Sequence, residues 1–321
     1  MNENPSCPVC DGTDLECVGA TTYSAGDMPK LDSYMQRKYR LLFEGWFPGL
    51  TKATFRSLLC RRCGCMLCSP RPSDEDLDRK YLLARSFGPH DHQTAVDDPG
   101  EQARAQSVFR STAPHLSKPQ STILDLGGGD GRMLMPFVRA GHSCFTVDYI
   151  LKTLEGVQRL GDTIRDIPPD RMFDAIVTCH VLEHVAEPVE QLKQLHARLS
   201  RGGILYAEVP LEIWKKPPPL SEPVTHINFY TRDSFRNLLQ RAGFQPLSCR
   251  VRRIRYHQMN MFAICALGRR AEGPVKVDYQ GDNPTRRLLR PPFALRARRA
   301  LYAWDKIPGV LMKKLVGSRQ Q

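Results

Sequence analysis

A glycine-rich loop with acidic neighbours is the part of this sequence whose residue types best suit the binding of a small molecule. Residues 123–132 read Ile-Leu-Asp-Leu-Gly-Gly-Gly-Asp-Gly-Arg, an apolar run followed by a G-x-G-x-G pattern. Glycine allows a positive φ and a close approach of the backbone to a ligand. Arg132 stands where a dinucleotide fingerprint would have its third glycine. The pattern therefore predicts a buried strand that turns into a cofactor-binding loop. The candidate cofactor-binding residues here are Asp125, Gly127, Gly128, Gly129 and Gly131.

The next 85 residues supply the strands and helices that such a loop needs around it. Residues 143–147 predict a strand that ends at Asp148, where an acidic side chain can accept hydrogen bonds from ribose hydroxyls. Residues 173–178 predict a further apolar strand, and 187–199 an amphipathic helix. A strand at 204–209 follows. This alternation of strands and helices predicts an α/β fold.

As an ordered set, these segments resemble the class I S-adenosylmethionine-dependent methyltransferases over residues 120–267. The resemblance implies a Rossmann-like, seven-stranded sheet, mostly parallel, with a C-terminal antiparallel hairpin at 244–255 and 259–267. It also implies S-adenosylmethionine as the cofactor. Asp125 would support the loop or the cofactor's amino group, and Asp148 would hold the ribose. For the adenine edge we expect Asp162 with Thr163, with Asp166 as the alternative.

Histidines near two strand ends are the candidates for catalysis. His226 precedes an aromatic segment and a predicted helix at 232–242. In some sugar methyltransferases of the resembled family, a histidine at this place is the general base, and imidazole has a pKa near neutrality. The alternative is a histidine that only hydrogen-bonds to the backbone. His180 follows the strand at 173–178 and is the second candidate, facing the acceptor.

Two C-x-x-C pairs, Cys7 with Cys10 and Cys60 with Cys63, have the spacing of a tetrahedral zinc site. The segment from Cys60 to the acidic helix start at 73–75 resembles the zinc-ribbon-like N-terminal module of certain sugar C- and O-methyltransferases. A structural Zn²⁺ is therefore expected. The pairs stand 49 residues apart, and Cys65, Cys68 or Cys17 could replace a ligand.

The sequence divides into four parts. Residues 1–83 form the zinc-binding module with an aromatic insert, and 84–119 a linker with a helix leading into the domain. Residues 120–268 form the methyltransferase domain, and 269–321 a basic amphipathic tail. The insert predicts either a small helical cap or a lid in which Trp46 or Phe47 touches the substrate.

Charge and composition limit the partners. The 321-residue chain has a net charge of +12, and from Arg269 onward 13 Lys/Arg stand against 4 Asp/Glu. A basic segment over 284–316 could contact an anionic membrane surface. With 11 cysteines and no apparent signal peptide, we expect a cytoplasmic protein, peripheral on the inner membrane face if the tail binds there. Nucleic acid is not expected as a partner because no RNA-binding signature is present.

The expected reaction is methyl transfer to oxygen or carbon of a small molecule or carbohydrate, including a lipid-linked glycan. The alternatives are an RNA or protein methyltransferase that docks through the tail, or an inactive binding protein of the same fold. The oligomeric state stays open.

Overall fold

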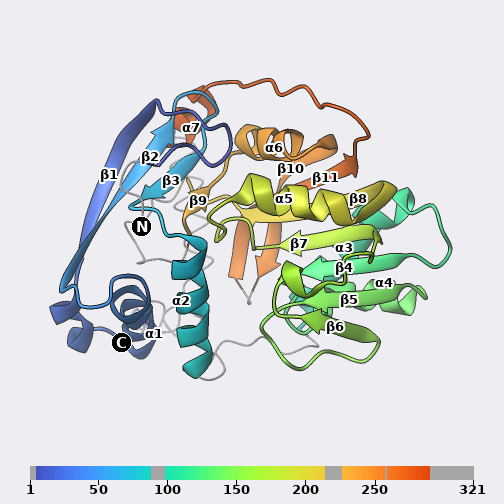
Figure 1. The fold of residues 1–321 in the computed structure, drawn as a ribbon, viewed down its shortest axis with the longest axis horizontal. Coiled ribbons are helices and arrows are strands. Elements are labelled where there is room, and N and C mark those ends of the chain that lie inside the picture. The colour runs from blue at the N-terminus through green and yellow to red at the C-terminus, as the bar shows by residue number, and fades with distance from the viewer. Residues whose placement is uncertain (1–4, 88–97, 214–225, 257–258, 290–321) are drawn as a thin grey trace, which may run out of the picture.

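The computed structural model describes residues 5–87, 98–213, 226–256 and 259–289, which form two sheets with helices around them (Figure 1). The larger sheet has seven strands in the order β10-β11-β8-β7-β4-β5-β6. Its strands are β4 (Thr122–Leu126), β5 (Ser143–Val147), β6 (Val157–Gly161), β7 (Phe173–Cys179), β8 (Leu199–Pro210), β10 (Phe244–Tyr256) and β11 (Met259–Arg270). Five are parallel, while β11 pairs antiparallel with both β8 and β10. The predicted fold class is confirmed.

Helices cover both faces of this sheet, which explains why its central strands are apolar without alternation. Ile123 and Leu124 are adjacent on β4, yet each is fully buried in a different hydrophobic cluster. One cluster includes residues of α3 (Pro99–Thr112) and α4 (Met135–Arg139), and the other includes residues of α5 (Pro188–Arg198) and α6 (Arg232–Arg241). Parallel strands buried on both faces read as continuous apolar runs.

The expected sheet has seven strands, but the sequence assigns no residue range to the strand observed as β6. The segment between Asp148 and Phe173 contains Val157–Gly161 as the edge strand beside β5. Only Val157 of its residues is buried. An edge strand with one buried side chain produces neither an apolar run nor a regular alternation, so no period of two residues marks this segment.

The smaller sheet builds the N-terminal module, with strand order β1-β2-β3-β9. Its members are β1 (Leu15–Ser24), β2 (Lys52–Cys60), β3 (Met66–Ser69) and β9 (Asn228–Phe229). Strand β9 follows His226 and pairs antiparallel with β3, so the methyltransferase domain donates the last strand of the module's sheet. The two parts of the chain are thereby joined through main-chain hydrogen bonds.

The aromatic insert is mainly a β-hairpin, and the expected helical cap is right only for part of it. Strands β1 and β2 pair antiparallel, and between them lie a 3-10 helix (Ala25–Lys30), α1 (Ser33–Arg40) and a π-helical turn (Leu41–Trp46). Trp46 is 3% exposed and packs among aromatic rings that include Phe55. Its indole ring therefore belongs to the module's core.

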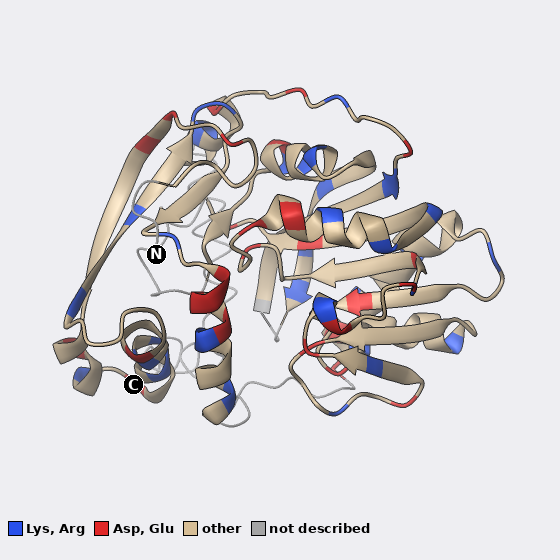
Figure 2. Cartoon of the chain, viewed as in Figure 1, with Lys and Arg blue, Asp and Glu red and all other residues tan. Residues whose placement is uncertain are grey.

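Helix α2 (Asp74–Ser86) follows the module, as the acidic segment predicted. Ser73 caps it by accepting a hydrogen bond from the Asp76 amide (3.2 Å), and the Asp76 carboxylate accepts one from the Ser73 amide (3.0 Å). Figure 2 shows acidic residues in its first turn, and Arg85 lies in its last turn, the arrangement that complements the helix dipole.

The start of the C-terminal segment packs against the N-terminal module. In α7 (Asn283–Leu289) the Thr285 hydroxyl donates a hydrogen bond to the Gly64 carbonyl (2.6 Å), and Arg286 forms an ion pair with Glu16. The predicted membrane-binding segment, 284–316, otherwise lies outside the described residues. Among the described helices, none is both long and apolar enough to cross a bilayer.

Candidate active site and metal centre

A cavity of about 850 Å³ opens at the carboxyl ends of β4 and β5, where the glycine loop begins. Gly127 has φ +70°, and its amide donates to the Val147 carbonyl (2.8 Å), which ties the loop to β5. A Cβ on Gly128 would collide with the Asp125 carboxyl. The cavity is lined by the loop, by the segment after β5, and by residues of α2, α3, β4, β7 and β10. The lining residues are Arg85, Glu101, Arg104, Asp125, Gly127, Gly128, Gly129, Asp130, Arg132, Met133, Asp148, Tyr149, Ile150, Leu151, Lys152, Thr153, Leu154, Cys179 and Tyr256.

Asp125 is a buried carboxylate on the cavity wall that accepts no hydrogen bond from any described side chain or backbone group. Its side-chain oxygens are both inaccessible and unpartnered. Burial, and then the nearby Asp148 carboxylate, raise the pKa of Asp125 well above its usual range. A bound cationic ammonium group would offset the desolvation cost of the buried Asp125 carboxylate, because a buried carboxylate needs a paired charge. The amino group of S-adenosylmethionine has that charge, so Asp125 fits the predicted role.

The Asp148 carboxylate connects the glycine loop to the segment that follows β5. One carboxylate oxygen accepts from the Gly129 amide (2.9 Å) and the other from the Ile150 amide (2.8 Å). Each oxygen keeps a further lone pair for a ligand hydroxyl. The predicted ribose contact is compatible with this position.

The adenine assignment to Asp162 and Thr163 stays a prediction, and neither residue lines the cavity. Asp162 forms an ion pair with Arg85 (3.1 Å), and the Thr163 side chain accepts a hydrogen bond from the Arg165 amide (3.3 Å). Tyr149 does line the cavity, and its ring stacks on Tyr81 of α2 at a centroid distance of 5.4 Å. Helix α2 thus brings Arg85 to the cavity and packs Tyr81 against its lining residue Tyr149, which no local sequence pattern indicated.

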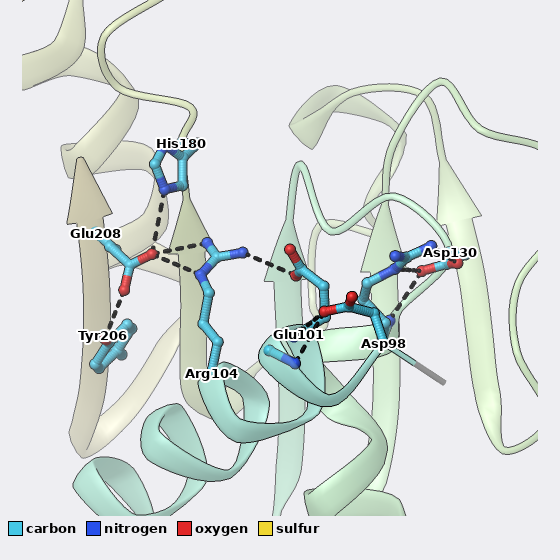
Figure 3. A network of polar contacts seen from close by, with 9 residues as sticks. Asp98, Glu101, Arg104, Asp130, His180, Tyr206 and Glu208 are labelled. Atoms are coloured by element: carbon cyan, nitrogen blue, oxygen red, sulfur yellow. Dashed lines mark hydrogen bonds and ion pairs between the residues drawn. The ribbon is translucent and has the colours of Figure 1, made fainter. Parts of the chain in front are cut away.

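A buried network of charged residues borders the cavity on the β8 side (Figure 3). The Arg104 guanidinium rises from α3 and contacts Glu208 Oε1 through Nε (2.8 Å) and an Nη (2.7 Å). The Tyr206 hydroxyl donates to the other Glu208 oxygen (3.1 Å), and Glu101 lies 3.5 Å from Arg104. Burial alone raises the pKa of Glu208, but Arg104 and His180 hold it well below its usual range.

His180 is joined to this network. Its backbone has φ +59°, and its ring stacks on Tyr256 at a centroid distance of 4.2 Å. Its two nitrogens lie 3.4 Å from Glu183 and 3.3 Å from Glu208. Burial by itself lowers the pKa of His180, yet these carboxylates raise it above its usual value. A non-glycine residue held at positive φ is a feature of functional sites.

A second histidine cluster lies beyond His180, around the buried carboxylate of Glu183. His184 Nε2 is 3.8 Å and His226 Nε2 is 4.0 Å from Glu183 Oε1. His226 Nδ1 is 2.5 Å from Glu212 Oε2. The structure thus brings both predicted catalytic histidines to one carboxylate, while the sequence reasoning missed Glu183, Glu208 and Glu212.

The four predicted zinc ligands converge. Their thiol sulfurs all lie within 4.8 Å of one another, with Cys7–Cys63 and Cys10–Cys60 separations of 3.5 Å. Four sulfurs at about 2.3 Å from Zn²⁺ would stand about 3.8 Å apart, so the group fits a tetrahedral ion. Cys65 and Cys68 instead have backbone carbonyls beside their sulfurs, at 3.5 and 3.7 Å, and Cys17 is exposed.

Both C-x-x-C pairs adopt the same turn. The Asp11 amide donates to the Cys7 carbonyl and the Gly64 amide to the Cys60 carbonyl, both at 2.9 Å. The residue after each second cysteine has a left-handed backbone, with φ +57° at Asp11 and +74° at Gly64. The β1–β2 hairpin spans the 49 intervening residues and returns Cys60 to Cys10.

Comparisons with known proteins agree with this architecture. Residues 101–248 match the family model described as a methyltransferase domain. The crystal structure of Burkholderia thailandensis 1,6-didemethyltoxoflavin-N1-methyltransferase, with bound 1,6-didemethyltoxoflavin and S-adenosylhomocysteine, aligns with a TM-score of 0.50. It is 17% identical and covers 65% of this chain and 96% of its own, which shows the shared fold. The predicted methyltransferase fold is therefore confirmed, and residues 101–248 are similar to a methyltransferase domain.

Curated relatives match over shorter stretches. A tRNA U34 carboxymethyltransferase of Campylobacter curvus is 26% identical over 54% of this chain and 65% of its own length. A ubiquinone biosynthesis O-methyltransferase of Ruegeria pomeroyi is 24% identical over 41% of this chain and 56% of its own length. The chain thus spans less than two thirds of either relative.

Proposed function

We propose that this protein is an S-adenosylmethionine-dependent methyltransferase that methylates an oxygen or carbon of a small molecule or carbohydrate. The observation that carries the proposal is the position of the buried, unpartnered Asp125 beside the glycine loop and Asp148, in one cavity of about 850 Å³. The methyltransferase domain that spans 101–248 supports the same cofactor.

The chain's own residues would bind and align the reactants. When bound, S-adenosylmethionine supplies a methyl group already activated on a sulfonium. Asp125 would neutralise the cofactor's ammonium group, and Asp148 would hold its ribose hydroxyls. The Arg104–Glu208 network keeps His180 oriented at the adjacent strand end. Alignment of two bound reactants supplies much of the rate enhancement in such a reaction.

The acceptor would lie on the side of His180, Glu183 and His226. A histidine here could take a proton from a hydroxyl or an acidic carbon of the acceptor. His226 is the proposed base, since Glu212 engages its Nδ1 and leaves Nε2 directed to the Glu183 side. The likeness to a ubiquinone biosynthesis O-methyltransferase supports an oxygen acceptor.

We also propose a structural Zn²⁺ at Cys7, Cys10, Cys60 and Cys63. Such ions contribute on the order of 10 kcal/mol to the folding of small modules. The ion would join the segment before β1 to the end of β2 and the turn before β3. Helix α2 follows β3 in the chain and brings Arg85 to the cavity.

A second candidate is an RNA methyltransferase. The likeness to a tRNA U34 carboxymethyltransferase and the net charge of +12 favour it. Because counterion release makes nucleic-acid binding fall steeply with salt, this candidate predicts salt-sensitive RNA binding.

One experiment separates these candidates. The full-length protein is incubated with methyl-tritiated S-adenosylmethionine and, in parallel, nucleotide sugars, lipid-linked glycans, hydroxylated quinone precursors and tRNA. Label in a small molecule or glycan supports the first candidate, and label in tRNA supports the second. Cofactor binding without transfer in any arm, together with no loss of binding in Asp148→Ala, would contradict both.

A further inference from the structure

We propose that Glu183, His184 and His226 form a binding site for a divalent transition-metal cation, distinct from the four-cysteine site. One ligand atom of each of the three residues lies within 4.8 Å of the others. The inference concerns metal binding alone and goes beyond the proposed methyl transfer.

The central observation is the state of the Glu183 carboxylate. Glu183 is 1% exposed, and neither of its carboxylate oxygens accepts a hydrogen bond from a described residue. Its neighbours are imidazole nitrogens of His180, His184 and His226, at 3.4, 3.8 and 4.0 Å. A buried carboxylate needs a charge partner or a bound cation to offset its desolvation cost, and these imidazoles supply a charge only when they are protonated. A cation bound to Oε1 would remove that cost.

The distances suit coordination after a small contraction. Ligand atoms at about 2.0–2.1 Å from a tetrahedral ion stand about 3.4 Å apart. The Glu183 oxygen stands 3.8 Å from His184 Nε2 and 4.0 Å from His226 Nε2. Side-chain rotations that shorten each distance by about half an ångström would bring these atoms to the spacing of ligands on one ion.

Glu212 supplies independent support. A histidine that binds a metal through one nitrogen usually donates its other N–H to a carboxylate, which fixes the tautomer. His226 shows this arrangement, with Nδ1 at 2.5 Å from Glu212 and Nε2 on the Glu183 side. The same nitrogen cannot bind a metal and act as a free base at once, so with the ion bound His226 would be a metal ligand and His180 would be the remaining candidate base.

The ligand set selects the class of ion. Two imidazoles and one carboxylate suit Mn²⁺, Fe²⁺, Co²⁺ or Zn²⁺ better than Mg²⁺ or Ca²⁺, which prefer all-oxygen ligands. The side chains of His184 and His226 are 22% and 18% exposed. The ion would therefore keep a coordination position open to water or to an acceptor oxygen.

The test is a Co²⁺ titration of full-length protein whose cysteine site is first loaded with Zn²⁺. Visible d–d absorption reports cobalt at a nitrogen–oxygen site, and a thiolate-to-cobalt charge-transfer band would reveal exchange at the cysteines. Wild type should bind about one Co²⁺ per chain. His184→Ala should abolish this signal, and Glu212→Gln, which keeps all three ligands, should weaken binding about 10–100-fold.

The matched control is His115→Ala, a histidine outside the cluster, which should bind Co²⁺ as wild type does. Melting temperatures show whether each variant is folded. Absence of a d–d signal in folded wild type up to millimolar Co²⁺, or equal affinity in His184→Ala, would overturn the inference. A parallel calorimetric titration with S-adenosylmethionine keeps the two proposals separate, because cofactor binding without cobalt binding refutes only the metal site.

Discussion

Removal of Arg104 tests whether the buried network beside the cavity holds its carboxylates in place. The Arg104 side chain is 5% exposed and that of Glu208 is 1% exposed, with two contacts of 2.7 and 2.8 Å between them. Arg104→Met keeps most of the side-chain length but removes the guanidinium from Glu101 and leaves His180 as the cationic partner of Glu208. Breaking a buried pair on one side costs about 3–5 kcal/mol. That is a large fraction of the roughly 5–15 kcal/mol that stabilises a typical domain.

The assay is urea denaturation at pH 7, with Arg110→Met as the control. Arg110 lies on the same helix but is exposed, so its loss should change the free energy of unfolding by at most about 0.5 kcal/mol. The double variant R104M/E208M should be more stable than R104M, because one uncompensated carboxylate is gone. Equal unfolding free energies for R104M and R110M would refute the reasoning.

The pH dependence of this effect has a definite sign. The folded-state pKa of Glu208 is lowered, so its contribution is present above the unfolded pKa of about 4.3 and is lost as the pH falls toward the folded value. Arg104→Met removes the largest of the interactions that lower this pKa. The stability gap between wild type and variant should be largest near neutrality and should narrow below about pH 4.

Three further predictions concern the metal module, the aromatic core and catalysis. Cys60→Ser should lower bound zinc, measured by mass spectrometry, and reduce the melting temperature, whereas the exposed Cys17→Ser should change neither; equal zinc content in both would contradict the site. Phe55→Ala should cost about 3–5 kcal/mol in denaturant unfolding because its ring is 1% exposed, against little change for Leu50→Ala, which is 52% exposed. His226→Ala should lower turnover about 100-fold or more while cofactor affinity stays near that of wild type; unchanged turnover would remove His226 from the site.

The parts of the fold that the sequence predicted best are those fixed by local chemistry. Strand β5 begins and ends at the predicted residues, because five consecutive residues between two turns leave little choice. The cysteine pairs converge as expected, since each C-x-x-C spacing sets its own turn. The 49-residue separation was harder to interpret. The paired strands β1 and β2 bring the two cysteine pairs together, while the helical residues between these strands have the composition of a separate helical cap.

The parts that the sequence did not predict depend on distant contacts. Arg104 and Glu208 are 104 residues apart, and nothing in either neighbourhood marks them as partners. The pairing of β9 with β3 joins Met66 to Phe229, far away in the sequence, and a two-residue strand has no period to detect. Glu183 stands beside His184 in the sequence, but the sequence does not show that its side chain is buried. Burial is what makes this carboxylate require a charge partner.

The most direct test of the central claim is calorimetric titration of the zinc-loaded protein with S-adenosylmethionine. We predict saturable binding of one cofactor per chain. Asp148→Ala should weaken binding about 10-fold or more, because charged hydrogen bonds contribute about 1.5–3 kcal/mol. The exposed Asp170→Ala should bind as wild type does. No detectable binding by folded wild type, or equal affinity in Asp148→Ala, would contradict the account.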